Sequence, residues 1–324
     1  DILAPFADDH RVRAVRRAFQ QVFNVLRRFV FPARRDEQVF FAVGDLEIAF
    51  LIDFPDVAGV EPAALQRRGR GFGFLEVSLE NDKSSLHHHN LDLHAVNGPG
   101  GGSVLTHVAP GETKTFRFKA LNPGLYIYHC AMPNVSTHNS HGQYGLIMVE
   151  PKDPKLALSK VDKEFYIVQG EFYTTGEIGK RGLMQFDSDA LIKGTPNYVV
   201  FNGKIESTPR LKARVGEKVR MYVGNGGVNL ISSFHVIGEV FDTVYPEANI
   251  GGSIEHNVQT TAVLPGGASI VEFTINAPGN YLLVDHALAR MNKGAWAILE
   301  VSGSDNPDIF KKVDGKSSAH NDTH

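Results

Sequence analysis

One stretch of this chain occurs twice, and the repeat limits the folds that are open to it. The segment PGETKTFRFKALNPGLYIYH, residues 110–129, returns as PGGASIVEFTINAPGNYLLVDH at residues 265–286. Residues 75–89 and 219–235 form a second matching pair. Because solenoid repeats recur about every 20 to 50 residues, so long a period indicates a duplicated domain. The positions that recur 155 residues apart are Pro110, Gly111, Phe118, Pro123, Gly124 and Tyr126, matched by Pro265, Gly266, Phe273, Pro278, Gly279 and Tyr281.

From about residue 75, short runs of Val, Ile, Phe and Tyr alternate with Gly, Pro and Asn. Such runs at a spacing of about 8 to 12 residues are typical of β-sandwiches. The 324 residues are enough for two domains that each bury a core. The sequence therefore predicts an all-β protein with two sandwiches in tandem.

Composition and charge exclude several classes of protein. A net charge of -3 and a pI near 6.6 argue against a nucleic-acid coat protein. No apolar run approaches the roughly 18 residues of a membrane span, and the segment that starts at Asp1 lacks a signal-peptide pattern. The single cysteine, Cys130, excludes an internal disulfide framework and leaves a buried filler, a nucleophile or a metal ligand.

The first 73 residues differ from the rest: they contain 11 Arg and no Lys, whereas the remaining 251 contain 6 Arg and 16 Lys. Residues 67–74 show no recognisable strand, turn and strand where the second half opens a strand pair. We interpret part of residues 1–73 as a misread or frame-shifted sequence in the place of the first domain's opening strands. The alternative is a divergent basic extension with an amphipathic helix over residues 12–31. The remaining predicted boundaries are a first domain at 74–150, a linker at 151–155, a second domain at 156–303 and a polar tail at 304–324.

Histidines gather around the single cysteine. On an extended strand neighbouring side chains point to opposite faces, so His129 and Cys130 are expected to serve two different sites. A thiolate with two imidazoles and a weak axial ligand forms a blue-copper electron-transfer site, and Cys130, His138 and His89 supply that set. A lone cysteine in a strand is more often a buried filler, but the surrounding histidines favour the ligand.

The second site is predicted on the other face, from His94 and His129 with one further imidazole. Three neutral imidazoles with an open position suit a catalytic copper or zinc ion. His286, at the end of the repeated strand, is the best candidate for the third.

The segments HNLDLHAVNG, GLYIYHCAMPNVSTH, GLIMVEP, SSFHVIGEVFD and YLLVDHALARMNKGA closely resemble the two-domain copper nitrite reductases, particularly their short-loop, outer-membrane-associated subgroup. The resemblance covers about residues 75–303. It implies two tandem cupredoxin-like Greek-key sandwiches, a homotrimer that reduces nitrite to nitric oxide, and two coppers per chain. One is a type 1 copper and the other a type 2 copper shared between subunits, where His94 and His129 meet His286 of the next chain.

The same resemblance assigns Asp92 and His235 as catalytic residues and Ile237 to the substrate pocket. It also implies a periplasmic or outer-membrane location and a small blue-copper protein or c-type cytochrome as electron donor. Reduction of nitrite takes one electron and two protons. The Cys130–His129 link would give the electron a short path between the coppers, and Asp92 and His235 could deliver the protons.

The chain departs from the family at the axial position of the first site, where Gln143 replaces the usual methionine. An amide oxygen can take this role, and we expect a lower redox potential than methionine gives. Met132 and His141 are possible substitutes, whereas Met148 is expected to pack in a core. His87 and His88 could shift the register of the histidine ligand, but only His89 gives the HNxDxH spacing.

Two alternatives stay open. A laccase-like two-domain multicopper oxidase would need several His-x-His pairs, and this chain has none outside the run His87–His89. A non-catalytic blue-copper electron carrier would leave the second site vacant.

Overall fold

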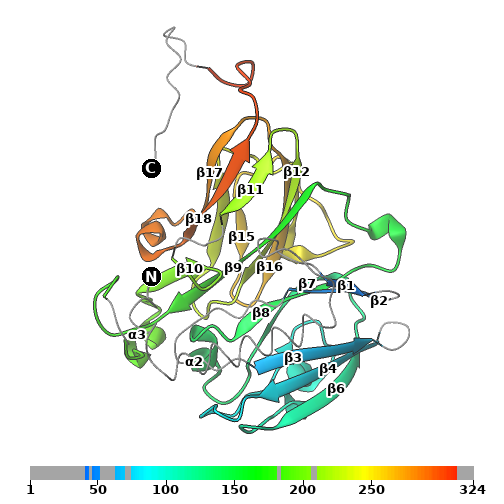
Figure 1. Cartoon of the computed structure of the whole chain (residues 1–324), viewed down its shortest axis with the longest axis vertical. Helices are drawn as coiled ribbons and strands as arrows, with labels where there is room; N and C mark the ends of the chain where they lie inside the picture. The colour runs from blue at the N-terminus through cyan, green and yellow to red at the C-terminus, as the bar shows by residue number, and fades with distance from the viewer. Residues whose placement is uncertain are drawn as a thin grey trace.

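The computed structural model describes strands at residues 41–43, 46–51 and 63–69, and then residues 74–180, 184–205 and 210–311. These residues form two β-sandwiches, the first below the second in Figure 1. The predicted all-β class and tandem arrangement are confirmed. Among the described residues, no helix is both long enough and apolar enough to cross a membrane.

The first sandwich pairs a five-stranded sheet with a three-stranded one. Its core is a cluster of alternate side chains that includes Leu75, Val77, Phe116, Tyr128 and Ile147. The five-stranded sheet has the order β1 (Phe41–Val43), β2 (Leu46–Leu51), β8 (Tyr144–Val149), β7 (Gly124–His129) and β5 (Asp92–Leu93), and the other has the order β3 (Ala63–Gly69), β4 (Phe74–Asn81) and β6 (Thr113–Lys119).

The second sandwich consists of two five-stranded sheets around a core that includes Phe201, Phe234, Phe241 and Phe273. Strand pairs β9/β12 and β11/β18 are parallel, and the other pairs are antiparallel. One sheet has the order β10 (Tyr198–Phe201), β9 (Lys163–Phe172), β12 (Lys218–Asn225), β16 (Ala268–Thr274) and β14 (Thr243–Tyr245), and the other has the order β11 (Leu211–Arg214), β18 (Trp296–Ser302), β17 (Gly279–Asp285), β13 (Ser232–Ile237) and β15 (Thr261–Val263).

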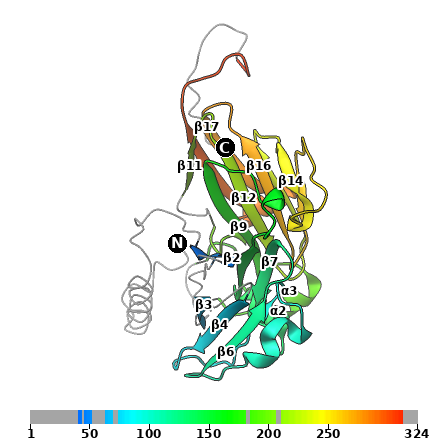
Figure 2. The same cartoon turned by 90° about the vertical axis from the view of Figure 1, so that its right-hand side faces the viewer.

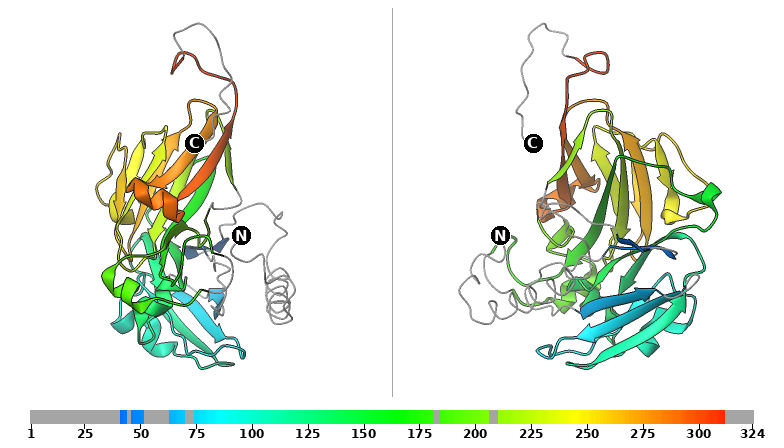
Figure 3. Two further views of the ribbon diagram at one scale, coloured as in Figure 1. Left: turned by 90° about the vertical axis from the view of Figure 1, so that its left-hand side faces the viewer. Right: turned by 45° about the vertical axis from the view of Figure 1, so that its right-hand side comes forward.

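Helical elements are short and lie between strands. α2 (Val135–Ser140) and α3 (Ser188–Lys193) lie near the junction of the sandwiches, where the rings of His141 and Phe186 have centroids 4.9 Å apart (Figures 1 and 2). Figure 3 shows η5 (Leu288–Lys293) at the end of β17, near the same junction. The remaining 3-10 turns are η2 (Pro99–Leu105), η3 (Pro154–Leu156) and η4 (Pro246–Ala248).

Strand β8 explains how the sandwiches hold together, since all six of its residues are buried. Ile147 and Val149 point into the first core, whereas Tyr144, Leu146 and Met148 join a separate cluster with residues of the second sandwich. A Cβ at Gly170 would lie 1.7 Å from Tyr144 Oη, so a side chain there would exclude that ring. The junction is therefore a hydrophobic core, and Met148 packs in it as predicted.

The expectation that residues 67–74 lack a strand pair is wrong. β3 runs to Gly69 and pairs antiparallel with β4, with Leu65 opposite Leu79. Main-chain pairing to an exposed sheet edge does not require good strand-forming side chains, and for that reason the arginine-rich composition concealed it. The predicted helix at residues 12–31 and the tail beyond residue 311 lie outside the described residues.

Candidate metal centres

The end of β7 separates two groups of metal-ligating side chains. Along this strand Tyr128 belongs to the first core, whereas Leu125 and Ile127 belong to the junction. His129 continues the face of Ile127, and it lines a cleft of about 440 Å³ between the sandwiches together with Tyr144, Gly226 and Gly266. Cys130 points the other way and is 5% exposed. The predicted division of two adjacent residues between two sites is what this geometry provides.

The first group consists of the potential ligand atoms of His89, Cys130 and His138, which all lie within 4.8 Å of one another. Cys130 Sγ is 3.8 Å from His89 Nδ1 and 3.6 Å from His138 Nδ1. Asn90 contacts the loop and the thiol together: its Oδ1 accepts a hydrogen bond from the Ala131 N–H at 2.8 Å and lies 3.9 Å from Cys130 Sγ.

Residues 130–143 form one closed loop. The Cys130 N–H donates to the Gln143 carbonyl at 3.0 Å, and within the loop α2 carries His138. Gln143 Oε1 lies 3.0 Å from His138 Nδ1. The amide oxygen of Gln143 therefore stands at the edge of this group.

The other histidine candidates for this site lie outside the group. His141 Nδ1 donates to the Thr137 carbonyl at 2.6 Å and its ring packs on Phe186, so it faces away. Met132 is half-buried in the loop after Cys130. His88 Nδ1 lies 2.9 Å from His107 Nε2 at the surface, and the ring centroid of His87 is 6.5 Å from that of His138. Of the three consecutive histidines, His89 enters the group.

The second group contains Asp92, His94 and His129, again with ligand atoms within 4.8 Å of one another. His94 Nε2 and His129 Nε2 are 3.1 Å apart, and Asp92 Oδ2 is 3.9 Å from His129 Nε2. Asp92 and His129 are cross-strand partners in the pairing of β5 with β7. The carboxylate is brought to the imidazoles by sheet register.

A hydrogen bond fixes the tautomer of His129, and burial lowers the pKa of His94. His129 Nδ1 donates to the Cys130 carbonyl at 3.0 Å, and since a carbonyl can only accept, the neutral ring keeps its lone pair on Nε2. Burial lowers the pKa of His94 below its usual value, and the neighbouring His129 lowers it further, while Asp92 and a backbone hydrogen bond to Gly266 oppose the change. The lowered pKa favours the neutral, metal-binding form of His94.

A glycine that the sequence analysis did not single out shapes the surroundings of Asp92. Gly101, within η2, has φ of +55°, and a Cβ there would lie 1.9 Å from Asp92 Oδ1 and 2.9 Å from the Leu93 carbonyl oxygen. The signal was present in the run Gly100-Gly101-Gly102, but only the fold brings it against the carboxylate.

His286 does not join His94 and His129 in the group found among the described residues of one chain. It lies just beyond β17, beside His235 on β13, with ring centroids 5.3 Å apart. His235 Nδ1 donates to the Gln259 carbonyl at 2.5 Å, and the nearby Ile237 is 41% exposed. The structure thus gathers Asp92, His94 and His129 in one place and His235, His286 and Ile237 in another.

Both donor sets fit copper. One buried thiol and two imidazoles in mutual contact match the soft, trigonal set of a blue-copper site, with an amide oxygen available as axial ligand. The two Nε2 atoms of the second group lie 3.1 Å apart, and they need a third imidazole to complete a three-histidine site.

Comparisons with known proteins agree with this chemistry. The family described as multicopper oxidase matches residues 76–154. The copper-containing nitrite reductase of Neisseria gonorrhoeae is 56% identical over 240 residues, covering 73% of this chain and 60% of the relative, so this chain spans less than two thirds of that relative's length.

The copper-containing nitrite reductase of Alcaligenes faecalis is 34% identical over 258 residues, covering 74% of this chain and 68% of the relative. The solved copper nitrite reductase of Nitrosomonas europaea superposes with a TM-score of 0.63 at 32% identity, covering 72% of this chain and 81% of that one. The two predicted cupredoxin-like sandwiches are confirmed, and the chain belongs to the copper-containing nitrite reductase family.

Proposed function

We propose that this protein reduces nitrite to nitric oxide and water, with one electron and two protons consumed per nitrite. The observation that carries the proposal is the division of His129 and Cys130 between two ligand groups on opposite faces of one strand end. Copper, when bound, supplies the one-electron redox chemistry at each group. The peptide link between Cys130 and His129 joins the two groups through a few covalent bonds.

His89, Cys130, His138 and Gln143 would hold a type 1 copper. Support comes from the mutual contact of thiol and imidazoles and from the position of Gln143 Oε1 beside His138. With an amide axial ligand we expect a blue or green centre of lower potential than a methionine-ligated one. An unchanged potential in Gln143→Met would contradict axial ligation by Gln143.

His94 and His129 would hold a type 2 copper together with His286 of a neighbouring subunit in a homotrimer. Because His286 stands with His235 rather than with His94, one chain supplies two parts of the site at different places. Apolar side chains lie exposed beside each part and suit an interface with another copy. They are Val104 (70%) and Leu105 (58%) on η2, and Ile237 (41%), Val240 (54%) and Leu288 (47%) near His235.

Asp92 and His235 would hold the protons that the reaction consumes. Asp92 Oδ2 lies 3.9 Å from His129 Nε2, close enough to hydrogen-bond a small anion there. His235 donates from Nδ1 to the Gln259 carbonyl, which leaves Nε2 to exchange a proton with substrate, and Ile237 would crowd the approach of nitrite.

A small blue-copper protein or c-type cytochrome would deliver the electron, and the protein would act in the periplasm or at the outer membrane. These two assignments are supported by family membership alone.

The decisive test is anaerobic reduction of nitrite by the copper-loaded protein with an artificial electron donor, monitored for nitric oxide. Asp92→Asn and His235→Ala should each lower turnover about 10²-fold or more while both coppers are retained, since general acids contribute about 10² to 10⁴-fold. Absence of nitric oxide from protein that holds two coppers per chain would refute the proposal.

An oxygen-reducing multicopper oxidase is the second candidate, favoured by the family match at residues 76–154. It would show about four coppers per chain and oxygen consumption. A blue-copper carrier would show one copper and neither activity.

A further inference from the structure

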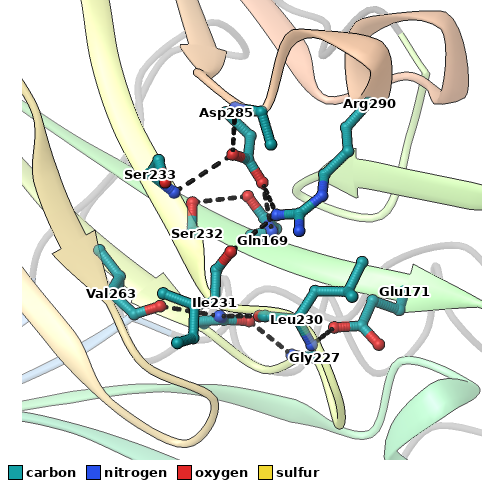
Figure 4. A network of polar contacts seen from close by, with 12 residues as sticks. Gln169, Glu171, Gly227, Leu230, Ile231, Ser232, Ser233, Val263, Asp285 and Arg290 are labelled. Atoms are coloured by element: carbon teal, nitrogen blue, oxygen red, sulfur yellow. Dashed lines mark hydrogen bonds and ion pairs between the residues drawn. The ribbon is translucent and has the colours of Figure 1, made fainter. Parts of the chain in front are cut away.

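A buried charged network stands directly before His286. Asp285, the last residue of β17, is 0% exposed, and its carboxylate meets the guanidinium of Arg290 from η5. Figure 4 shows these two side chains converging with Gln169 and with the main chain of Ser233. Residues of both sheets of the second sandwich therefore meet at one carboxylate.

Every oxygen of that carboxylate is occupied. Oδ1 accepts hydrogen bonds from the Ser233 N–H at 3.2 Å and the Ala287 N–H at 3.1 Å. Oδ2 accepts from Gln169 Nε2 at 3.1 Å and from Arg290 Nη1 at 2.5 Å. Asp285 directly precedes His286, and its carboxylate binds the main chain of Ala287, directly after His286, and of Ser233 on β13. These bonds hold the segment around His286 against β13.

Further bonds tie the same two segments together. Arg290 Nη1 also donates to the Ile231 carbonyl at 2.7 Å, and the His286 N–H donates to the Ser233 carbonyl at 2.7 Å. Gln169 is held in turn, because Ser232 Oγ donates to its Oε1 at 2.6 Å. Residues 231–233 lead into His235, so the network joins the segment that carries His235 to the segment that carries His286.

A buried ion pair contributes little net stability compared with apolar packing, because both charges lose their hydration. It does specify geometry, since four donors aimed at one carboxylate allow a single arrangement of the chain around it. Support of this kind around a metal-binding histidine typically changes metal affinity 10 to 100-fold.

We propose that Asp285 and Arg290 are positioning residues that set the His286 imidazole for copper and hold it in register with His235. The inference rests on the proposed function, in which His286 completes the type 2 site of a neighbouring subunit. Neither residue touches substrate or metal; they act through the main chain at Ser233 and Ala287.

The test compares copper binding by Asp285→Asn and Arg290→Gln with the parent, on the fraction with the parent's oligomeric mass. Type 2 affinity, measured by chelator competition and by electron paramagnetic resonance, should fall about 10 to 100-fold. The type 1 absorption per chain should stay unchanged and serves as an internal reference. Arg290→Lys keeps the positive charge and should lie closer to the parent than Arg290→Gln.

Arg290 is partly exposed at 22%, so its variants remain informative if Asp285→Asn does not fold. A matched control is Arg220→Met, which breaks a buried ion pair with Glu272 in the other sheet of the same sandwich. It should lower stability without weakening type 2 copper.

Three results would overturn the positioning role: unchanged type 2 affinity in folded Arg290→Gln, equal weakening in Arg220→Met, or no type 2 copper in the parent. Parent protein that binds two coppers but does not reduce nitrite would refute the proposed function alone. The affinity comparison would still decide the positioning role.

Discussion

The same strand end is used differently in the two sandwiches. The 155-residue offset of the repeat matches Cys130 with Asp285, and each side chain is buried where its strand leaves the sheet. Around Cys130 the fold places two imidazoles and an amide, whereas around Asp285 it places a guanidinium, an amide and two backbone N–H groups. One end gathers a set of potential metal ligands and the other holds a salt bridge.

The difference shows that a buried polar side chain at this position needs polar partners, which are imidazoles around Cys130 and an ion pair with hydrogen-bond donors around Asp285. The turns that follow β5 and β13 close with the same type of hydrogen bond but carry different side chains. After β5 a turn closes with the Val96 N–H donating to the Leu93 carbonyl, and after β13 the Glu239 N–H donates to the Val236 carbonyl. Val96 at the first turn is partly buried against a core, whereas the second turn carries the carboxyl group of Glu239.

The largest effect is expected at the metal end of this comparison. Cys130→Ser should abolish the type 1 absorption and electron delivery, and with them nitrite reduction, because a hydroxyl does not replace a soft thiolate as copper ligand. Visible spectroscopy and copper counts on the purified variant check this.

As the reciprocal change, Asp285→Cys should produce no coloured site, because no imidazole contacts Asp285 among its described partners. A new thiolate–copper absorption band in Asp285→Cys would contradict the inferred difference between the surroundings of Cys130 and Asp285.

Breaking the buried ion pair between Arg220 and Glu272 in the second sandwich should lower stability without changing copper binding. Arg220→Met removes the guanidinium from Glu272, which is 1% exposed but keeps Lys218 Nζ at 2.7 Å, and we expect the free energy of unfolding to fall by about 3 kcal/mol, the lower end for a broken buried ion pair. Denaturant unfolding of the copper-free protein measures the change. Arg210→Gln, at an exposed pair with Glu300, should cost less than about 1 kcal/mol. A loss below 1 kcal/mol in Arg220→Met would show that the pair is dispensable.

A smaller effect is expected from the glycine that faces Asp92. Gly101→Ala places a methyl group on the carboxylate, so turnover should fall about 10²-fold while both coppers remain bound. Steady-state nitric oxide production with copper analysis checks this. Gly98→Ala, where a Cβ meets nothing within 4 Å, is the matched control. Equal losses in both variants would mean that the loop, rather than Asp92, is responsible.

The smallest effect is expected in the pH dependence of the free energy of unfolding. It tests the difference between Val96 and Glu239. Burial, and then the nearby Asp242, raise the pKa of Glu239 from 4.5 to about 7. Between these values the folded protein keeps a proton that the unfolded chain has lost, so the free energy of unfolding falls as pH rises through the window. Glu239→Gln should remove about 2 kcal/mol of that fall between pH 4.5 and pH 8, less than the full shift would give because solvent screens the half-buried carboxyl group.

Urea unfolding of the parent and of Glu239→Gln at both pH values measures this. Asp242→Asn should remove only part of the fall, since desolvation is the larger cause of the shift. Identical pH dependence in the parent and Glu239→Gln would show that Glu239 does not titrate in this window.

Local patterns were enough to predict a large part of the candidate site. Alternation along β7 separates Cys130 from His129 without knowledge of any other strand, and the spacing in HNLDLH places His89 three residues before Asp92 and five before His94. The arginine-rich composition misled the prediction for residues 67–74, because strand formation depends on the neighbouring strand and its context more than on intrinsic propensity.

By itself the sequence determined the two sandwiches, the buried thiol and the opposite orientation of its neighbouring histidine, because these follow from repeats and from the period of two in a strand. Only the tertiary structure decided that Gly101 touches Asp92, that Arg290 meets Asp285, and that His286 stands with His235 apart from His94. These contacts depend on how strands and loops pack, and no local pattern of residue types encodes that packing.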